Sequence, residues 1–141
     1  MVKPSSFCTL CTNTCYQELI GLLLTLSIHH QNEKIYCLVD TKTKEQIEKV
    51  TPKIKLNIIF VVQLDKYTDK NRQMMVNSGI WGEFQMKKAE IIDITLKTEN
   101  DTLFLDSDIF ILGEINDVDL SKEIGVSPHY IKKKDTDQYG Y

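Results

Sequence analysis

Strand-like and helix-like segments alternate along the first 112 residues, and this alternation limits the folds that the chain can adopt. Four short apolar segments have the composition of strands, at 6–12, 34–40, 56–64 and 102–106. Between them, apolar residues recur at helical spacing at 14–30 and at 80–98. A further helix is predicted after 34–40, because Thr41 or Thr43 can cap it and Pro52 ends it. Alternating strands and helices predict an α/β domain with a mostly parallel, Rossmann-like sheet flanked by helices.

Several details follow from the composition of single segments. Residues 56–64 are apolar throughout, so we expect this strand to be covered on both faces. Residues 65–79 are polar and aperiodic, which predicts a long loop or short irregular helices, often found at functional sites. A fifth short strand is predicted at 123–129. A chain of 141 residues suits one domain, so 1–141 is predicted to be a single one.

Charge and hydropathy exclude some classes of function. The net charge of −3 argues against a general nucleic-acid-binding surface. The longest apolar segment, 19–28, is much shorter than the roughly 20 residues of a transmembrane helix, so no membrane span is expected. The first eight residues lack the apolar core of a signal peptide, which predicts a cytoplasmic protein.

Cys8, Cys11 and Cys15 form a C-x2-C-x3-C pattern that suggests a zinc or iron–sulfur site. A closed zinc site needs four ligands, and the fourth cysteine, Cys37, lies in the apolar segment IYCLV. Alternation along a strand would also place Cys8 and Cys11 on opposite faces. Small buried thiols acting as apolar side chains are therefore the favoured interpretation.

The segment TLFLDSDIFIL, 102–112, carries Asp106 and Asp108 inside an apolar run. If the strand continues through them, both carboxylates point to one side, repel each other and are costly to desolvate. The two aspartates could simply cap the turn that ends the strand. A divalent cation, Mn²⁺ or Mg²⁺, would offset the repulsion directly, because carboxylate oxygens are ligands that these ions prefer.

Other uses of an Asp-x-Asp motif fit less well. A calcium EF-hand loop needs a further oxygen ligand and a glycine, where this chain has Phe110 and Ile111. Haloacid-dehalogenase-like phosphotransferases place such a motif after their first strand, not their fourth. In a parallel α/β sheet, ligands bind at the carboxyl ends of the strands. Asn13, Asp40 and the two aspartates are expected at that edge, although Asp40 is favoured as a helix cap.

Three features in register resemble the GT-A nucleotide-diphospho-sugar glycosyltransferases, of the family-8 type. They are TNTCY (12–16) at the end of the first strand, Lys88 on the helix before the aspartate motif, and FLDSDIFIL itself. The resemblance covers residues 6 to about 129. It matches the donor-binding half of such a domain, so the chain is expected to be incomplete at its C-terminus.

The resemblance implies a metal-dependent transfer of sugar from a nucleotide-diphosphate donor, in particular a UDP-sugar, to an acceptor hydroxyl. The residues implied to bind the nucleotide sugar are Thr12, Asn13, Tyr16, Lys88, Asp106, Ser107 and Asp108. Asn13 would contact the base and Tyr16 would stack on it, while Asp106 and Asp108 would hold Mn²⁺ or Mg²⁺. The alternative is a catalytically silent nucleotide-binding or interaction module. Lys88 could instead face solvent, and Tyr16 could simply pack on the core. Trp81 is expected to anchor its helix, with stacking on the acceptor as the alternative, and His29 and His30 to lie at the surface.

Overall fold

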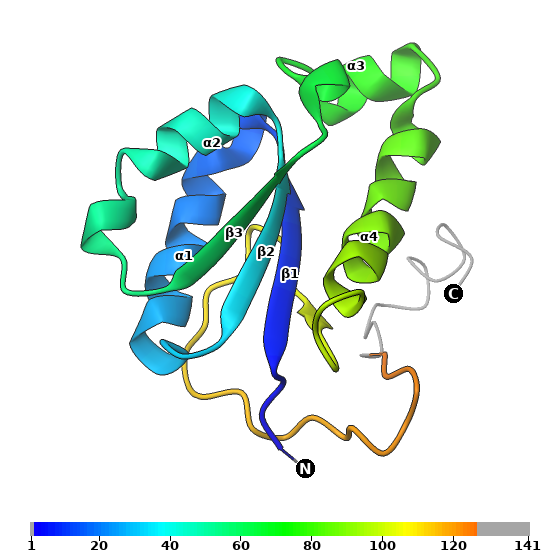
Figure 1. The fold of residues 1–141 in the computed structure, drawn as a ribbon. Helices are drawn as coiled ribbons and strands as arrows, with labels where there is room; N and C mark the ends of the chain where they lie inside the picture. Colours follow the sequence, from blue (N-terminus) through cyan, green and yellow to red (C-terminus); the bar gives the residue numbers. More distant parts are fainter. Residues whose placement is uncertain (1, 127–141) are drawn as a thin grey trace, which may run out of the picture.

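The computed structural model describes residues 2–126 and contains a four-stranded, all-parallel sheet (Figure 1). Its strands are β1 (Ser6–Cys11), β2 (Lys34–Val39), β3 (Asn57–Val62) and β4 (Leu103–Phe104), in the spatial order β3-β2-β1-β4. The three longer strands are in register along their whole length, with Cys11 beside Val39 and Val39 beside Val62. The predicted α/β class with a parallel sheet flanked by helices is confirmed.

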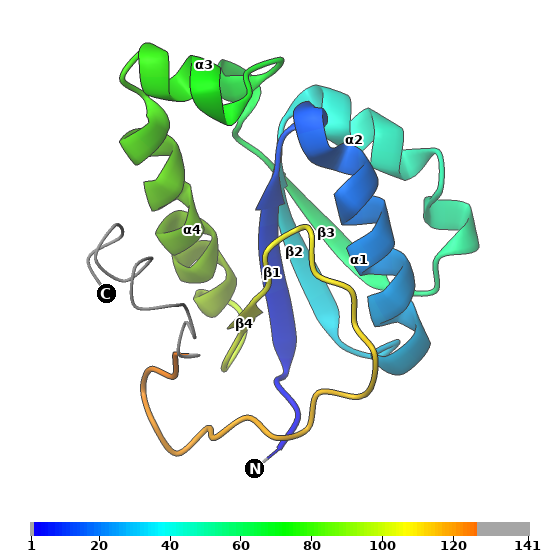
Figure 2. The same cartoon turned by 180° about the vertical axis from the view of Figure 1, so that it is seen from behind.

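Helices cover both faces of this sheet (Figures 1 and 2). On one face lie α1 (Tyr16–His29) and α2 (Thr41–Glu48), and on the other α3 (Arg72–Asn77) and α4 (Trp81–Leu96). Three 3-10 turns complete the described elements: η1 (Asn13–Cys15), η2 (Thr51–Lys53) and η3 (Asp65–Tyr67). The long polar segment 65–79 thus contains η3 and α3, in agreement with the prediction of short helices.

The two faces of the sheet form two apolar cores. On β1, Phe7 and Cys11 face α1, whereas Cys8 and Leu10 face α4, as alternation along a strand requires. Four leucines of α1, namely Leu19, Leu22, Leu23 and Leu26, are fully buried against the first group. Each such side chain contributes about 1.5–3 kcal/mol by leaving water, which fixes α1 against the sheet.

Two predictions about the strands are wrong. Within the described residues β3 is an edge strand, and its side chains are half-buried or exposed instead of being covered on both faces. The strand predicted at 102–106 is only two residues long. Leu105 N still donates to Cys8 O, but the chain then turns at Ser107 and leaves the sheet.

The start of α2 is capped by Asp40, the favoured role for this residue. Its buried carboxylate accepts hydrogen bonds from the backbone N and hydroxyl of Thr43, and from Thr68 Oγ1 at 2.8 Å. Thr41, one of the two predicted caps, is instead the first residue of the helix. Asp40 therefore joins β2, α2 and the loop after η3.

After the turn at Ser107, the chain crosses to the α1 side of the sheet and runs along α1 (Figure 2). Ile111 N donates to Thr25 Oγ1 and Ile115 N to His30 Nε2, both at 2.9 Å. His30 is consequently buried, and the expectation that it lies at the surface is wrong, while His29 is half-buried. Of the predicted strand 123–129, residues 123–126 are not in a strand and 127–129 lie outside the described residues.

Over residues 2–126, no helix combines sufficient length with sufficient apolar character to span a bilayer.

Candidate functional site

The strand order changes direction at β1. From β1 the chain passes to β2 and β3 on one side, and it returns to β4 on the other side. In open α/β sheets, ligands bind at such a switch point, in the crevice outside the carboxyl ends of the strands. A ligand site is therefore expected at the carboxyl ends of β1 and β4 and in the loops that follow them.

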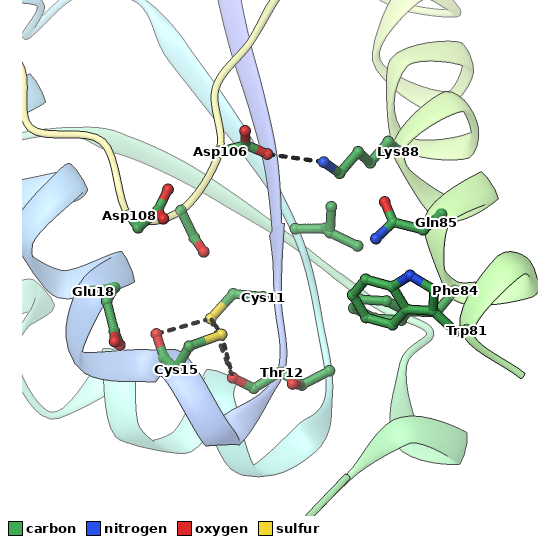
Figure 3. Close-up of a pocket in the computed structure, with 12 residues that line it drawn as sticks. Cys11, Thr12, Cys15, Glu18, Trp81, Phe84, Gln85, Lys88, Asp106 and Asp108 are labelled. Atoms are coloured by element: carbon green, nitrogen blue, oxygen red, sulfur yellow. Dashed lines mark hydrogen bonds and ion pairs between the residues drawn. The ribbon is translucent and has the colours of Figure 1, made fainter. Parts of the chain in front are cut away.

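A pocket of about 280 Å³ lies at this switch point (Figure 3). It is bounded by the end of β1, the start of α1, one side of α4 and the turn after β4. Its lining residues are Leu10, Cys11, Thr12, Cys15, Glu18, Trp81, Phe84, Gln85, Lys88, Asp106, Ser107 and Asp108. Of the seven residues implied to bind the nucleotide sugar, five therefore share one pocket: Thr12, Lys88, Asp106, Ser107 and Asp108.

Asp106 and Asp108 occupy the turn after β4, where Ile109 N donates to Asp106 O at 3.2 Å. Both are exposed, so their carboxylates do not carry the cost of burial that the sequence suggested. Asp106 Oδ1 lies 3.0 Å from Lys88 Nζ, with the two side chains 56% and 41% exposed. In Figure 3, Asp106 points to α4, whereas Asp108 lies nearer to α1.

Asp106 and Asp108 do not form a complete metal site by themselves. Within residues 2–126, no group of three or more His, Cys, Asp or Glu side chains is placed to hold a metal ion. Mg²⁺, however, commonly uses one or two carboxylates together with the phosphates of its substrate. Both aspartates line the pocket and offer oxygen donors of the kind that such a cation takes, and the ligand would have to supply the remaining oxygens.

Trp81 and Phe84 form an aromatic wall on the α4 side of the pocket, which the sequence analysis missed. Their ring centroids are 5.7 Å apart and their planes differ by 31°. The guanidinium of Arg72 lies 5.2 Å from the centroid of Trp81. For Trp81 the sequence favours a helix anchor over stacking on an acceptor, and Phe84 is not among the predicted site residues.

Asn13 and Tyr16, two of the predicted site residues, are not among the lining residues of this pocket. The Asn13 amide binds Asp69 twice: Nδ2 donates to Oδ1 at 2.7 Å, and Oδ1 accepts from Asp69 N at 2.8 Å. Lys42 Nζ lies 2.7 Å from the other carboxylate oxygen of Asp69. Hydrogen bonds from Lys42 and then Asn13 lower the pKa of Asp69, so its carboxylate is ionised while it holds this loop.

Cys11 and Cys15 also line the pocket, and their sulfurs lie 3.4 Å apart. Cys8 and Cys37 are buried in the cores, and all four cysteines are free thiols. The C-x2-C-x3-C pattern thus does not converge on one point, since Cys8 faces the other side of β1. Only its C-x3-C half brings two thiols together.

Comparison with protein-family models, with curated proteins and with solved structures gave no match to this chain.

Proposed function

We propose that this pocket binds a nucleotide-diphosphate sugar together with Mn²⁺ or Mg²⁺, and that the chain is the donor-binding part of a GT-A-like glycosyltransferase. One observation carries the proposal. The Asp106-Ser107-Asp108 turn and Lys88 face the same pocket, at the point where the strand order changes direction. This arrangement supports the proposal, because carboxylates are ligands for a divalent cation and an ammonium is a ligand for a phosphate.

The charges of the lining explain why a cation belongs in the proposal. Glu18, Asp106 and Asp108 line the pocket opposite a single ammonium, that of Lys88. A bare diphosphate would meet a net negative wall and be repelled. A divalent cation reverses this, because it binds the aspartates and the phosphates at once.

The remaining walls suit the rest of the donor. Trp81 and Phe84 present an apolar, aromatic surface against which a sugar or a base can pack. The sequence resemblance assigns the base to Asn13 and Tyr16 instead. For that contact, Asn13 would exchange its two hydrogen bonds to Asp69 for bonds to the base.

In such a transfer, the lining side chains would bind the cation, the phosphates and the rest of the donor. Asp106 and Asp108 would hold the cation, which when bound neutralises charge on the departing nucleoside diphosphate. Lys88 would exchange its contact with Asp106 for a phosphate oxygen and add a second positive charge. The aromatic wall would keep the donor oriented and would shield it from water on the α4 side.

Calorimetric titration with UDP in the presence of Mn²⁺ tests the donor site. Asp108→Asn removes a carboxylate charge with little change of shape, and we expect it to weaken binding by about tenfold or more, or about 1.4 kcal/mol. Asp93→Asn, on the exposed side of α4, is the matched control and should bind as the unaltered chain does. Equal affinity in the Asp108→Asn variant would remove the aspartates from the site.

Binding without transfer is the second candidate function. The lining favours this candidate, because few acidic groups are left for catalysis. Once the two aspartates hold the cation, Glu18 is the one remaining acidic group among the described lining residues. A turnover assay with UDP-sugars and Mn²⁺ separates the two candidates. Release of UDP above the rate of the Asp108→Asn variant supports a transferase, and tight binding without turnover supports a binding module.

A further inference from the structure

Two thiols face each other at the wall of the pocket (Figure 3). Cys11 is the last residue of β1 and is 2% exposed, while Cys15 precedes α1 and is half-buried. Their sulfurs are 3.4 Å apart, and Cys15 borders the open pocket. A disulfide needs an S–S separation of about 2.05 Å, so a shift of little more than an ångström would join them.

The surroundings of the two sulfurs give them different roles. Cys11 Sγ lies 3.1 Å from Thr12 O and 3.2 Å from Cys15 O, and it can donate to either carbonyl. Cys15 Sγ lies 3.6 Å from Thr12 O, at the more accessible end of the pair. Cys15 is therefore placed to meet a small reagent from the pocket, and Cys11 to react only with Cys15.

Protonation reinforces this division. The hydrogen bond from Cys11 lowers the pKa of Cys15 to about 6, although burial opposes the shift. The same contact, together with burial, raises the pKa of Cys11. At neutral pH the pair therefore consists of a Cys15 thiolate and a Cys11 thiol, and the thiolate is the form that attacks peroxides and disulfides.

We propose that Cys11 and Cys15 are a peroxide-reactive dithiol pair that closes reversibly to a disulfide at the wall of this pocket. The Cys15 sulfur attacks one oxygen of hydrogen peroxide and the O–O bond breaks. This yields a sulfenic acid on Cys15, and the released hydroxide takes up a proton to leave as water. The Cys11 sulfur then attacks the Cys15 sulfur, the S–O bond breaks, and the Cys11 proton leaves with the hydroxyl group as a second water. Two thiols are oxidised by two electrons, and one peroxide is reduced.

The position of the pair links its oxidation to the rest of the site. Ser107, which lies between the two aspartates, lines the same pocket as Cys11 and Cys15. Disulfide formation replaces a charged thiolate by a neutral bridge next to the turn that carries Asp106 and Asp108. This chemistry does not depend on which ligand the pocket holds.

Peptide mapping by mass spectrometry tests the proposal on the full chain. The reduced protein is treated with a small excess of hydrogen peroxide, alkylated, unfolded and alkylated again with a second reagent. We expect one intramolecular Cys11–Cys15 disulfide that dithiothreitol reverses, while Cys8 and Cys37 remain thiols and provide the internal control. Cys15 that stays a free thiol, or that is oxidised to a sulfinic acid without bridging, would overturn the proposal.

Two variants separate the steps. In Cys11→Ser the sulfenic acid on Cys15 has no partner, so dimedone should label Cys15 after peroxide treatment. In Cys15→Ser, Cys11 should remain a thiol. Alkylation of Cys15 in the unaltered protein should rise with a midpoint near pH 6. A midpoint near the ordinary cysteine pKa of about 8.5, or dimedone labelling of Cys11 in Cys15→Ser, would contradict the assigned roles.

Discussion

Lys88 Nζ of α4 lies 3.0 Å from Oδ1 of Asp106 in the turn after β4, and both residues line the pocket. Both side chains are substantially exposed, and pairs of this kind contribute only about 0.2–1 kcal/mol to stability. A ligand can therefore separate the two at little cost. Under the proposed function, Asp106 would then bind the cation and Lys88 a phosphate of the ligand.

Replacing Lys88 by alanine should change the binding of the cation and of the nucleotide in opposite directions. Without Lys88, the Asp106 carboxylate has no ammonium to compete with a cation, so Mn²⁺ alone should bind more tightly. UDP with Mn²⁺ should bind about three- to tenfold more weakly, because one charged hydrogen bond to phosphate is lost. Calorimetry with Mn²⁺ alone and with Mn²⁺ plus UDP measures both effects.

Lys87→Ala is the matched control for this experiment. Lys87 is the neighbouring residue on α4, but its ammonium pairs with Glu90 at 2.9 Å and does not line the pocket. It removes the same charge from the same helix, so long-range electrostatic effects are shared. If both variants change binding equally, the contact between Lys88 and Asp106 has no specific role.

Asp40→Ala should be among the more damaging single substitutions in the chain. The buried carboxylate caps α2 and accepts the Thr68 hydroxyl, so alanine leaves the Thr43 amide and two hydroxyls without their acceptor. Loss of a cap and of buried hydrogen bonds should lower the free energy of unfolding by about 2–3 kcal/mol. Urea denaturation followed by circular dichroism measures this change.

Asp65→Ala is the control variant for the loss of stability expected in Asp40→Ala. Asp65 also accepts from the start of α2, from Thr41 N at 2.7 Å and Thr41 Oγ1 at 2.9 Å, but these contacts are exposed. Water can replace them, so the expected loss is below about 1 kcal/mol. Equal losses in the two variants would mean that burial of the Asp40 carboxylate adds nothing to the cap.

The parallel sheet and its helices could be predicted because their signals are local. Strand alternation places Cys8 and Cys11 on opposite faces, and the buried stripe of α1 has helical spacing. The edge position of β3 was not predictable in the same way. A strand at the edge and a strand in the centre can have equally apolar sequences, and only the order of the strands distinguishes them.

The candidate site was predictable in part for a related reason. Thr12 and the 106–108 turn follow strands, so the parallel sheet brings them to one edge. The pairing of Asn13 with Asp69, and of Cys11 with Cys15, depends on the path of loops. Asp69 adopts a positive φ of 63° in its loop, a conformation that no periodic pattern in the sequence reports. The burial of His30 likewise depends on the later segment that runs over α1.

His30→Leu should loosen that segment. The buried imidazole accepts the Ile115 amide, and leucine keeps most of the volume while leaving this N–H without an acceptor. We expect a loss of about 1–3 kcal/mol and faster hydrogen exchange at Ile115. Thr25→Val should instead speed exchange at Ile111, whose amide the Thr25 hydroxyl accepts. Unchanged exchange at Ile115 in His30→Leu would exclude the imidazole as the anchor of the segment.

Tyr67 should make the stability of the fold depend on alkaline pH. Its ring is buried against Phe84, and its hydroxyl donates to Glu83. Burial, and then the hydrogen bond to Glu83, raises the pKa of Tyr67 to about 12, above the ordinary value of about 10. Because the folded state holds this proton more tightly than the unfolded state, the contribution is complete below pH 10 and is lost as the pH rises through 12.

Tyr67→Phe isolates this contribution, since it keeps the ring and removes only the titrating hydroxyl. At neutral pH the variant should lose about 0.5–1.5 kcal/mol, the value of one hydrogen bond. Between pH 10 and 12 the unaltered chain should lose stability more steeply than the variant, so the two unfolding free energies should converge. Tyr16→Phe, which is outside this hydrogen bond, is the control at neutral pH and should lose less stability there than Tyr67→Phe. Parallel curves for Tyr67→Phe and the unaltered protein, measured by urea denaturation at each pH, would show that the Tyr67 hydroxyl does not titrate differently on folding.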